Sequence, residues 1–325
     1  MRYRRVGESG LRVSELSLGG WSVAQNKLDR QELSRLLSEA LERGVNSIDL
    51  ADIYAQGEVE SLCGELLRDY PRHQLVLTSK CYWPMSQGVN DRGLSRKHIH
   101  ESVAGSLKRL QTDYLDLYYC HRFDAETPLE ETVRAIGDLI SRGQILYWGV
   151  CGWSSKQLKQ TIELCRALNV PSPISHQLLY NVLERGAERE LLPNTQASGL
   201  GVSVWSPLAG GCLARVGGAT QDAEGGQSQR KATANGSDRW DSNWSMLRDS
   251  DTIQGDSALE SFGVLAERVN VTPAQLALSW VLRRVEVSTV VMGVSSLEQL
   301  SQNISTIDQA IPEQMWRAID ERFPL

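Results

Sequence analysis

Four residues able to act as an acid, a base or a placed charge follow strand-like runs of the sequence. Asp49 follows the run VNSI, Lys80 follows LVLTS, His121 follows YLDLYYC, and Tyr54 lies five residues after Asp49. Buried parallel strands read as short apolar runs. In a (β/α)8 barrel the C-terminal ends of all the strands open onto one face, so residues far apart in sequence can converge there. The sequence therefore predicts one catalytic site made of these four residues.

The four side chains suit the reduction of a carbonyl group. Hydride transfer to a carbonyl leaves negative charge on its oxygen, and a placed proton donor must neutralise that charge as it develops. A free tyrosine has a pKa of about 10, and a nearby ammonium lowers this pKa. We expect Tyr54 to be the general acid, Lys80 its tuning charge, Asp49 the partner of Lys80, and His121 the group that orients the substrate oxygen. Taken singly, Lys80 and Asp49 could instead form a structural ion pair, and His121 could be a core histidine.

Composition narrows the class of protein. The chain has 325 residues, 41% of them hydrophobic and 23% charged, which is ordinary for a globular enzyme. Its net charge of −6 and pI near 5.5 argue against a nucleic-acid partner, which needs a basic stripe. No apolar stretch approaches the roughly 18 residues of a membrane span, and no cluster has the spacing of metal ligands. The six cysteines form no C-x-x-C pair and the N-terminus has no apolar signal core, so we expect free thiols in a cytoplasmic protein. The sequence leaves the oligomeric state open.

Strand-like and helix-like segments alternate about every 30 residues, a pattern typical of parallel βαβ units. Candidate strands end near Gly19, Asp49, Lys80, His121, Val150, Gln177, Trp205 and Gly293. Eight strands are what a closed barrel requires. We therefore predict the α/β class, with residues 1–325 forming a single-domain (β/α)8 TIM barrel and residues 3–13 a short N-terminal hairpin.

Capping residues mark the starts of the intervening helices. Asp29, Ser95, Ser154 and Thr272 each precede an amphipathic run, and Thr127-Pro128-Leu129-Glu130 reads as a capping box with proline in the first helical position. The stretch from Ala214 to Gly255 breaks the rhythm because it is rich in Gly, Ser, Gln, Asp and Asn. A loop of this length in a barrel is either a functional lid or disordered. Since it follows the seventh strand, on the catalytic face, we favour a lid.

Several motifs, in order and at barrel spacing, resemble those of the aldo-keto reductase family. They are Gly10-Leu11-Arg12-Val13-Ser14, Asp49-Leu50-Ala51-Asp52-Ile53-Tyr54, Thr78-Ser79-Lys80, Tyr114-Leu115-Asp116-Leu117 leading to His121, Trp205-Ser206-Pro207-Leu208-Ala209, and Gly293-Val294-Ser295-Ser296 with Glu298-Gln299-Leu300 and Asn303. The segments 93–99 and 147–149 look most like the branch that contains the potassium-channel β-subunits. The resemblance implies NADPH-dependent reduction of aldehydes or ketones to alcohols, with a small-molecule carbonyl compound as the partner.

The resemblance also implies a site for NADPH. The counterpart of Trp205 stacks on the nicotinamide ring in the family, although a core tryptophan is the simpler reading of that residue alone. The small residues after Trp205 allow close approach to a pyrophosphate, and hydroxyl caps at a helix N-terminus favour phosphate oxygens. The cofactor residues expected on this basis are Gly20, Trp21, Asp49, Gln177, Trp205, Ser206, Pro207, Leu208, Ala209, Gly210, Gly211, Gly293, Ser295, Gln299, Gln302 and Asn303.

Two departures from the family pattern lower the expected affinity for NADPH. Relatives usually carry Ser followed by Asn or Arg after the fifth strand, where this chain has Cys151 and Gly152, so we expect Gln177 to bear more of the carboxamide recognition. The segment 293–303 lacks the Lys or Arg that many members place on the 2′-phosphate. Cations that could replace it lie in the long loop, at Arg215, Arg230, Lys231 and Arg239. We therefore expect a preference for NADPH over NADH, with a modest margin.

The substrate pocket is predicted from aromatic residues just past strand ends. Trp21, Trp83 and Trp153, together with Tyr54 and His121, would form an aromatic mouth suited to apolar aldehydes, although core packing is the alternative for Trp83 and Trp153.

Two other functions compete with carbonyl reduction. One is an NADPH-binding regulatory or redox-sensing protein of the potassium-channel β-subunit type with little turnover. The other is a barrel isomerase or lyase, which leaves the four catalytic candidates unexplained. Channel β-subunits carry Asn where this chain has His121, and the histidine favours catalysis.

Overall fold

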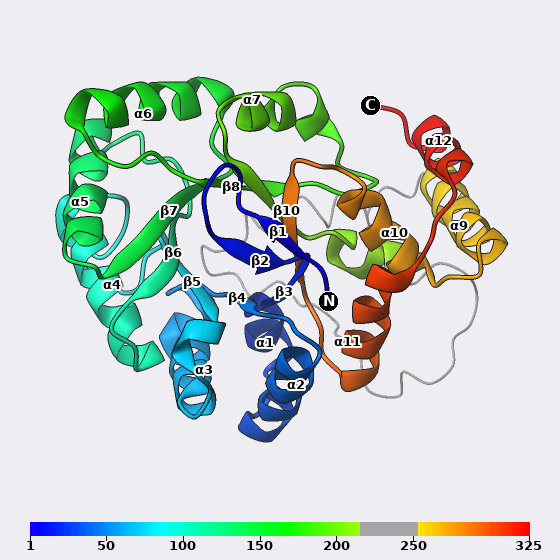
Figure 1. The fold of residues 1–325 in the computed structure, drawn as a ribbon, viewed down its shortest axis with the longest axis horizontal. Helices are drawn as coiled ribbons and strands as arrows, with labels where there is room; N and C mark the ends of the chain where they lie inside the picture. The colour runs from blue at the N-terminus through cyan, green and yellow to red at the C-terminus, as the bar shows by residue number, and fades with distance from the viewer. Residues whose placement is uncertain (215–252) are drawn as a thin grey trace.

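Eight parallel strands close into a barrel in the computed structural model of the chain, which describes residues 1–214 and 253–325 (Figure 1). Around the barrel the strands lie in the order β10-β3-β4-β5-β6-β7-β8-β9. Their bounds are β3 (Leu16–Gly19), β4 (Ser47–Asp49), β5 (Val76–Cys81), β6 (Leu115–Cys120), β7 (Ile145–Cys151), β8 (Ser175–Leu179), β9 (Gly201–Trp205) and β10 (Val287–Met292). The architecture is the predicted (β/α)8 TIM barrel.

The strand ends agree with the sequence because short apolar runs in this chain are buried on both faces. Strands β3, β4 and β9 end at the predicted Gly19, Asp49 and Trp205. The largest difference is at β8, which continues two residues past the predicted Gln177 to Leu179. Every residue of β5, β6 and β10 is buried, as expected for strands covered by helices outside and by side chains within.

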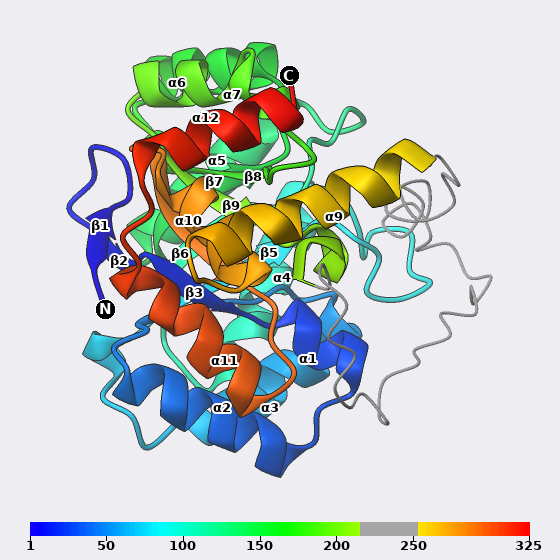
Figure 2. The ribbon, with the colours of Figure 1, turned by 90° about the vertical axis from the view of Figure 1, so that its right-hand side faces the viewer.

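The predicted N-terminal hairpin is present and lies at one end of the barrel. Strands β1 (Tyr3–Arg5) and β2 (Arg12–Ser14) pair in antiparallel register, with Arg4 opposite Val13. Val6 and Val13 pack on Val76 at the start of β5. Figure 2 shows the hairpin at one end of the barrel and α1 (Trp21–Asn26) towards the other. The hairpin therefore covers the N-terminal end and leaves the strand C-termini for a site.

Helices surround the barrel in the described part of the chain. Their bounds are α2 (Arg30–Glu42), α3 (Glu58–Leu67), α4 (Arg96–Leu110), α5 (Leu129–Ser141), α6 (Ser155–Leu168), α7 (Leu191–Ala197), α9 (Ile253–Arg268), α10 (Pro273–Leu282), α11 (Leu297–Ile304) and α12 (Glu313–Arg322). Short 3-10 turns lie at η1 (Tyr54–Gly57), η2 (Arg72–Gln74), η3 (Gly186–Glu188), η4 (Ala209–Ala214) and η5 (Ser305–Asp308). None of the helices among the described residues combines the length and apolar composition needed to cross a membrane.

Four of the five predicted helix caps are confirmed. The side chains of Asp29, Ser95, Ser154 and Thr272 each accept a hydrogen bond from a backbone N–H in the first turn. The box at Thr127 is wrong. Helix α5 begins at Leu129, Pro128 is its cap, and no side chain closes the turn.

Thr127 does not cap α5 because it lies one residue before the cap position, Pro128, and its hydroxyl contacts the preceding loop. Its Oγ1 donates to Asp124 Oδ2 at 2.7 Å, and the same carboxylate oxygen accepts from the Leu94 backbone N–H. Asp124 therefore organises the loop before α5 in place of the predicted box.

The predicted lid falls largely outside the described residues. Residues 215–252 are not described, and with them Arg215, Arg230, Lys231 and Arg239. The last residues of the predicted loop, from Ile253 onward, belong to helix α9.

Candidate functional site

The strand ends bring the predicted catalytic residues together. Lys80 Nζ donates to Asp49 Oδ2 at 2.7 Å and lies 3.4 Å from the Tyr54 hydroxyl. The ring centroids of Tyr54 and His121 are 6.3 Å apart, with the rings nearly perpendicular. All four side chains are buried, and Lys80 is fully so. Residues from three neighbouring strands and one following turn thus form a single cluster.

Asp49 is held by more groups than the sequence indicated. Its second oxygen, Oδ1, accepts hydrogen bonds from Thr78 Oγ1 and from Gln177 Nε2, both at 3.0 Å. Lys80 Nζ also donates to the Leu50 carbonyl at 2.7 Å, so the ammonium has two oxygen acceptors besides Tyr54. These bonds fix the carboxylate and the ammonium against each other. Thr78 was noted in the sequence only as part of a family motif and was given no role, although it lies two residues before Lys80 and so shares its face of the strand.

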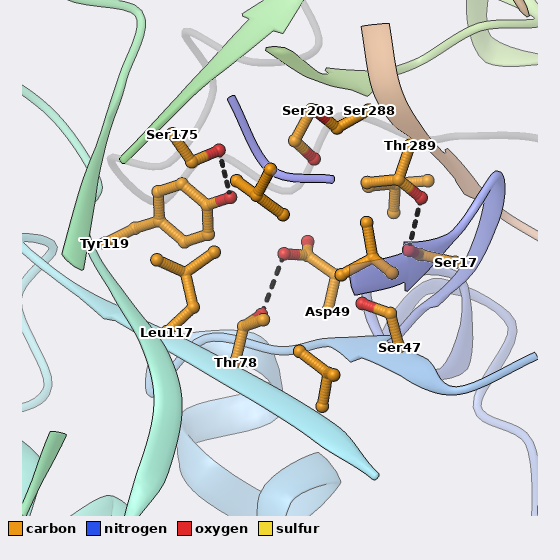
Figure 3. Close-up of a pocket in the computed structure, with 14 residues that line it drawn as sticks. Ser17, Ser47, Asp49, Thr78, Leu117, Tyr119, Ser175, Ser203, Ser288 and Thr289 are labelled. Atoms are coloured by element: carbon orange, nitrogen blue, oxygen red, sulfur yellow. Dashed lines mark hydrogen bonds between the residues drawn. The ribbon is translucent and has the colours of Figure 1, made fainter. Parts of the chain in front are cut away.

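A small polar cavity lies inside the barrel next to Asp49 (Figure 3). Its volume is about 10 Å³, room for about one water molecule. The hydroxyl-bearing residues of its wall are Ser17, Ser47, Thr78, Tyr119, Ser175, Ser203, Ser288 and Thr289. Barrel interiors are usually filled by branched apolar side chains. Here hydroxyls share the wall with apolar side chains, and one of them, Thr78 Oγ1, donates to the Asp49 carboxylate, which lowers the cost of keeping its charge buried.

The pKa of Tyr54 reflects two opposing effects. Burial raises the pKa, and the positive charge of Lys80 lowers it. Burial is the larger effect, and the pKa of Tyr54 stands at about 12. Lys80 therefore lowers the pKa of Tyr54, as predicted, but not enough to bring it below that of a free tyrosine. Tyr54 is protonated at neutral pH, the state that a general acid needs.

At neutral pH the Lys80 side chain is charged and the His121 side chain is neutral. Burial is the largest single effect on Lys80 and disfavours its ammonium, but the charge and hydrogen bond of Asp49, with smaller effects from Tyr54 and Cys151, together raise the pKa of Lys80. Burial, together with the charges of Lys80 and Arg122, holds the pKa of His121 well below its usual value. His121 is therefore a neutral imidazole, in which one ring nitrogen carries a proton and can donate a hydrogen bond.

Two of the three predicted pocket tryptophans lie beside the predicted catalytic residues. Trp21 is 46% exposed, and its ring centroid is 5.4 Å from that of Tyr54. Trp83 is half-buried, with its ring centroid 6.3 Å from that of His121. Trp153 is only 1% exposed and packs edge-on against Phe123. The structure thus leaves Trp21 and Trp83 near the mouth of the site and places Trp153 in the core.

The backbone after β9 forms a tight turn, as its small residues suggested. Ser206 and Ala209 adopt left-handed conformations with φ of 51°, and Gly210 and Gly211 have φ of 62° and 94°. Asn181 Nδ2 donates to the Ser206 carbonyl at 2.9 Å and steadies the turn. Left-handed non-glycine residues are costly and gather at functional sites. Pro207 and Ala209 are buried, whereas Trp205 and Leu208 are half-buried.

The predicted phosphate-binding residues lie at the exposed start of α11. Ser296 caps the helix by accepting from the Gln299 backbone N–H. Gln299 Oε1 accepts from both the backbone N–H and the hydroxyl of Ser295. Glu298 lies in the same first turn, where its charge opposes an anion. The last two predicted residues differ, because Asn303 is buried while Gln302 is exposed and donates to Glu298 at 3.3 Å.

Gly20 and Gly293, two of the four glycines predicted to contact the cofactor, differ in their surroundings. A Cβ on Gly20 would come 2.6 Å from a methyl of Leu50, so close packing requires glycine there. A Cβ on Gly293 would meet Ser22 at an ordinary 3.5 Å, and Gly293 is exposed.

Arg122 adds a cation to the site that the sequence reasoning missed. Its Nη1 donates to the His121 carbonyl at 2.6 Å and lies 3.2 Å from Cys151 Sγ. Cys151 Sγ in turn lies 3.7 Å from Gln177 Oε1. The only signal in the sequence was that Arg122 directly follows His121. Gly152, beside it, has a left-handed φ of 64°.

Comparison with known proteins gives one consistent result. Residues 15–322 match the model of the aldo/keto reductase family. A probable voltage-gated potassium channel subunit beta of Oryza sativa subsp. japonica is 40% identical over 314 residues, which cover 95% of this chain and 92% of that protein. A protein of Arabidopsis thaliana with the same description is 38% identical over 314 residues, which cover 95% of this chain and 92% of that protein.

Proposed function

The chain belongs to the aldo/keto reductase family, and we propose that it reduces aldehydes and ketones to alcohols with NADPH, Tyr54 serving as the general acid. Family membership supports the oxidoreduction of carbonyl compounds. The finer proposal is carried by one observation, the buried line from Asp49 through Lys80 to the Tyr54 hydroxyl.

Each catalytic side chain has one task in this proposal. NADPH, when bound, supplies the hydride. Tyr54 donates its phenolic proton to the substrate oxygen as negative charge develops there. Lys80 stabilises the tyrosinate that remains, and Asp49 keeps Lys80 charged and in place. His121, neutral and buried, orients the substrate oxygen by donating a hydrogen bond.

The residues near this site fit a dinucleotide in kind. A half-buried tryptophan at 205 offers a flat apolar face for a nicotinamide ring. The left-handed turn 206–211 leaves backbone accessible to a pyrophosphate, and the exposed, hydroxyl-capped start of α11 suits a phosphate. Gln177 offers its amide for the carboxamide, although its Nε2 already donates to Asp49.

A regulatory function of the channel-subunit type is the second candidate. The names of the two plant relatives favour it, while the neutral His121 beside Tyr54 favours turnover. The test is to mix the purified protein with NADPH and a panel of aldehydes and to follow the reduced-nicotinamide absorbance. Turnover supports the reductase, and tight NADPH binding without turnover supports the sensor.

We expect NADPH to bind more tightly than NADH, by a modest margin. The cause is the N-terminus of α11, which favours a phosphate, while Glu298 opposes it. Ser295→Asp should shift the preference towards NADH because it adds a like charge beside the 2′-phosphate. Fluorescence titration of both cofactors measures this, with Ser301→Asp, late in the same helix, as the control. Equal dissociation constants for NADPH and NADH in the unaltered protein would show that α11 does not bind the 2′-phosphate.

Gly152→Asn is expected to strengthen NADPH binding by adding a side-chain amide near the carboxamide. A new hydrogen bond corresponds to a rise of about 2- to 13-fold in affinity. The Cβ would meet Arg122 Nη1 at an ordinary 3.6 Å, and asparagine tolerates the left-handed conformation better than most residues.

Gly152→Ala is the matched control, since it carries the backbone cost of about 1–2 kcal/mol without the amide. Calorimetric titration and thermal melts of both variants separate the effects. If Asn also lowers the melting temperature and leaves affinity unchanged, Gly152 serves the backbone and the carboxamide is held elsewhere.

A further inference from the structure

A second buried carboxyl group lies directly behind the catalytic cluster. Asp52 is fully buried and lies in the short segment between Asp49 and Tyr54. Its backbone N–H donates to the Lys80 carbonyl at 3.2 Å. Ser102 Oγ of helix α4 donates to Asp52 Oδ2 at 2.7 Å, while Oδ1 has no hydrogen-bond partner. The side chain therefore links the segment before Tyr54 to a helix outside the barrel.

The groups that surround Asp52 come from three further elements. Glu60 of α3 is fully buried and holds Arg109 of α4, with Arg109 Nε 2.7 Å from Glu60 Oε2. Cys81 of β5 lies close by, and Tyr118 of β6 donates its hydroxyl proton to Ser102 Oγ at 2.9 Å. Arg109, the cation that acts on Asp52, is thus already paired with Glu60, and the charge of Glu60 itself disfavours ionisation of Asp52.

This geometry favours the neutral form of the Asp52 carboxyl. A buried carboxylate needs several donors or a paired cation, and Asp52 has one side-chain donor and an unpartnered oxygen. Burial above all, with a smaller effect from Glu60, raises the pKa of Asp52 to about 7. The hydrogen bond from Ser102, the backbone N–H of Ile53 and the charge of Arg109 act in the opposite direction but do not cancel burial.

The turn that carries Tyr54 needs such a support. Ala55, Gln56 and Gly57 follow Tyr54 with φ of 47°, 55° and 89°, so three consecutive residues are left-handed. Strain of this kind persists only where the surroundings fix the backbone.

We propose that Asp52 is a positioning residue for Tyr54. Its neutral carboxyl group, bonded to Ser102, ties the Tyr54 turn to helix α4. Ionisation of the carboxyl group would strengthen the single bond from Ser102, but it would leave a buried charge without a paired cation, so the fold is more stable with the neutral form. This inference rests on the proposed function in so far as Tyr54 is the general acid, and it adds a second acid that governs where Tyr54 stands.

The first test removes the tie without touching the site. Ser102→Ala should lower kcat by roughly 2- to 13-fold, the factor for one lost hydrogen bond, with the KM values for NADPH and aldehyde unchanged. It should also speed hydrogen exchange at the backbone amides of residues 51–57. Ser106→Ala is the control, because Ser106 is equally buried on α4 but contacts Ser79 and Arg109 instead. If Ser102→Ala matches Ser106→Ala in both measurements, Asp52 does not position Tyr54.

The second test addresses the charge state with Asp52→Asn, which mimics the neutral carboxyl group. With the folded pKa raised, the folded state binds more protons than the unfolded state from about pH 4 to pH 7, so the unaltered protein loses stability as pH rises through that range. The asparagine variant lacks this loss. Its melting temperature relative to the unaltered protein should rise from about pH 4 to about pH 7 and then level off, because above that pH the carboxyl group is ionised in both the folded and the unfolded state.

A constant or falling difference in melting temperature would overturn the neutral carboxyl group. The melting and exchange measurements need no turnover, so they separate this inference from the proposed function. An inactive protein would reject the reductase, and hydrogen exchange would still decide whether Asp52 and Ser102 hold the Tyr54 turn.

Discussion

Tyr54→Phe is expected to lower kcat by at least roughly 10²-fold, the low end for loss of a general acid. The substitution removes only the hydroxyl that lies 3.4 Å from Lys80 Nζ. The remaining ring keeps its contact with Trp21, so NADPH should bind almost as before. Steady-state kinetics and a fluorescence titration of NADPH measure the two effects separately.

Tyr82→Phe is the matched control for this experiment. Tyr82 stacks edge-on against Trp83, so the variant loses a hydroxyl near the same pocket but outside the line from Asp49 to Tyr54. Its kcat should stay within about twofold, the size of one exposed hydrogen bond. A Tyr54→Phe enzyme as fast as Tyr82→Phe would show that another group supplies the proton.

The sequence predicted the barrel and the meeting of the candidate catalytic residues because both depend on local signals. Each strand is a short apolar run, and each candidate lies at or just past the end of such a run, so the fold alone brings Asp49, Lys80 and His121 onto one face. Tyr54 follows by its fixed spacing from Asp49. Four of the five helix caps also followed from local sequence, and the exception is α5, which starts one residue later than predicted so that Pro128 and not Thr127 lies at its cap.

Features that depend on contacts between residues distant in sequence, or on opposing energetic effects, could not be predicted from the sequence. The pKa of Tyr54 is set by burial against the charge of Lys80, and no spacing tells which is larger. The core position of Trp153 depends on packing against Phe123, because a tryptophan past a strand end suits a pocket wall equally well. The environment of Asp52 is shaped by Ser102, which lies 50 residues away.

Lys80→Met should be as damaging to kcat as Tyr54→Phe and should also destabilise the fold. Without the ammonium, the pKa of Tyr54 loses the main effect that lowers it, and the tyrosinate formed on proton donation loses its stabilising charge. The carboxylate of Asp49 would remain buried with only Thr78 and Gln177 as donors. Breaking a buried pair in this way costs about 3–5 kcal/mol of unfolding free energy, measurable by denaturant titration.

A double variant separates the two effects of Lys80. Asp49→Asn added to Lys80→Met removes the unpaired carboxylate, so most of the lost unfolding free energy should return, because a neutral amide at position 49 is cheaper to bury than a charge. Activity should not return, since Tyr54 still lacks the ammonium. If the double variant regained kcat together with stability, Lys80 would act only as the structural partner of Asp49. If it regained stability alone, the charge of Lys80 would be required for proton donation by Tyr54.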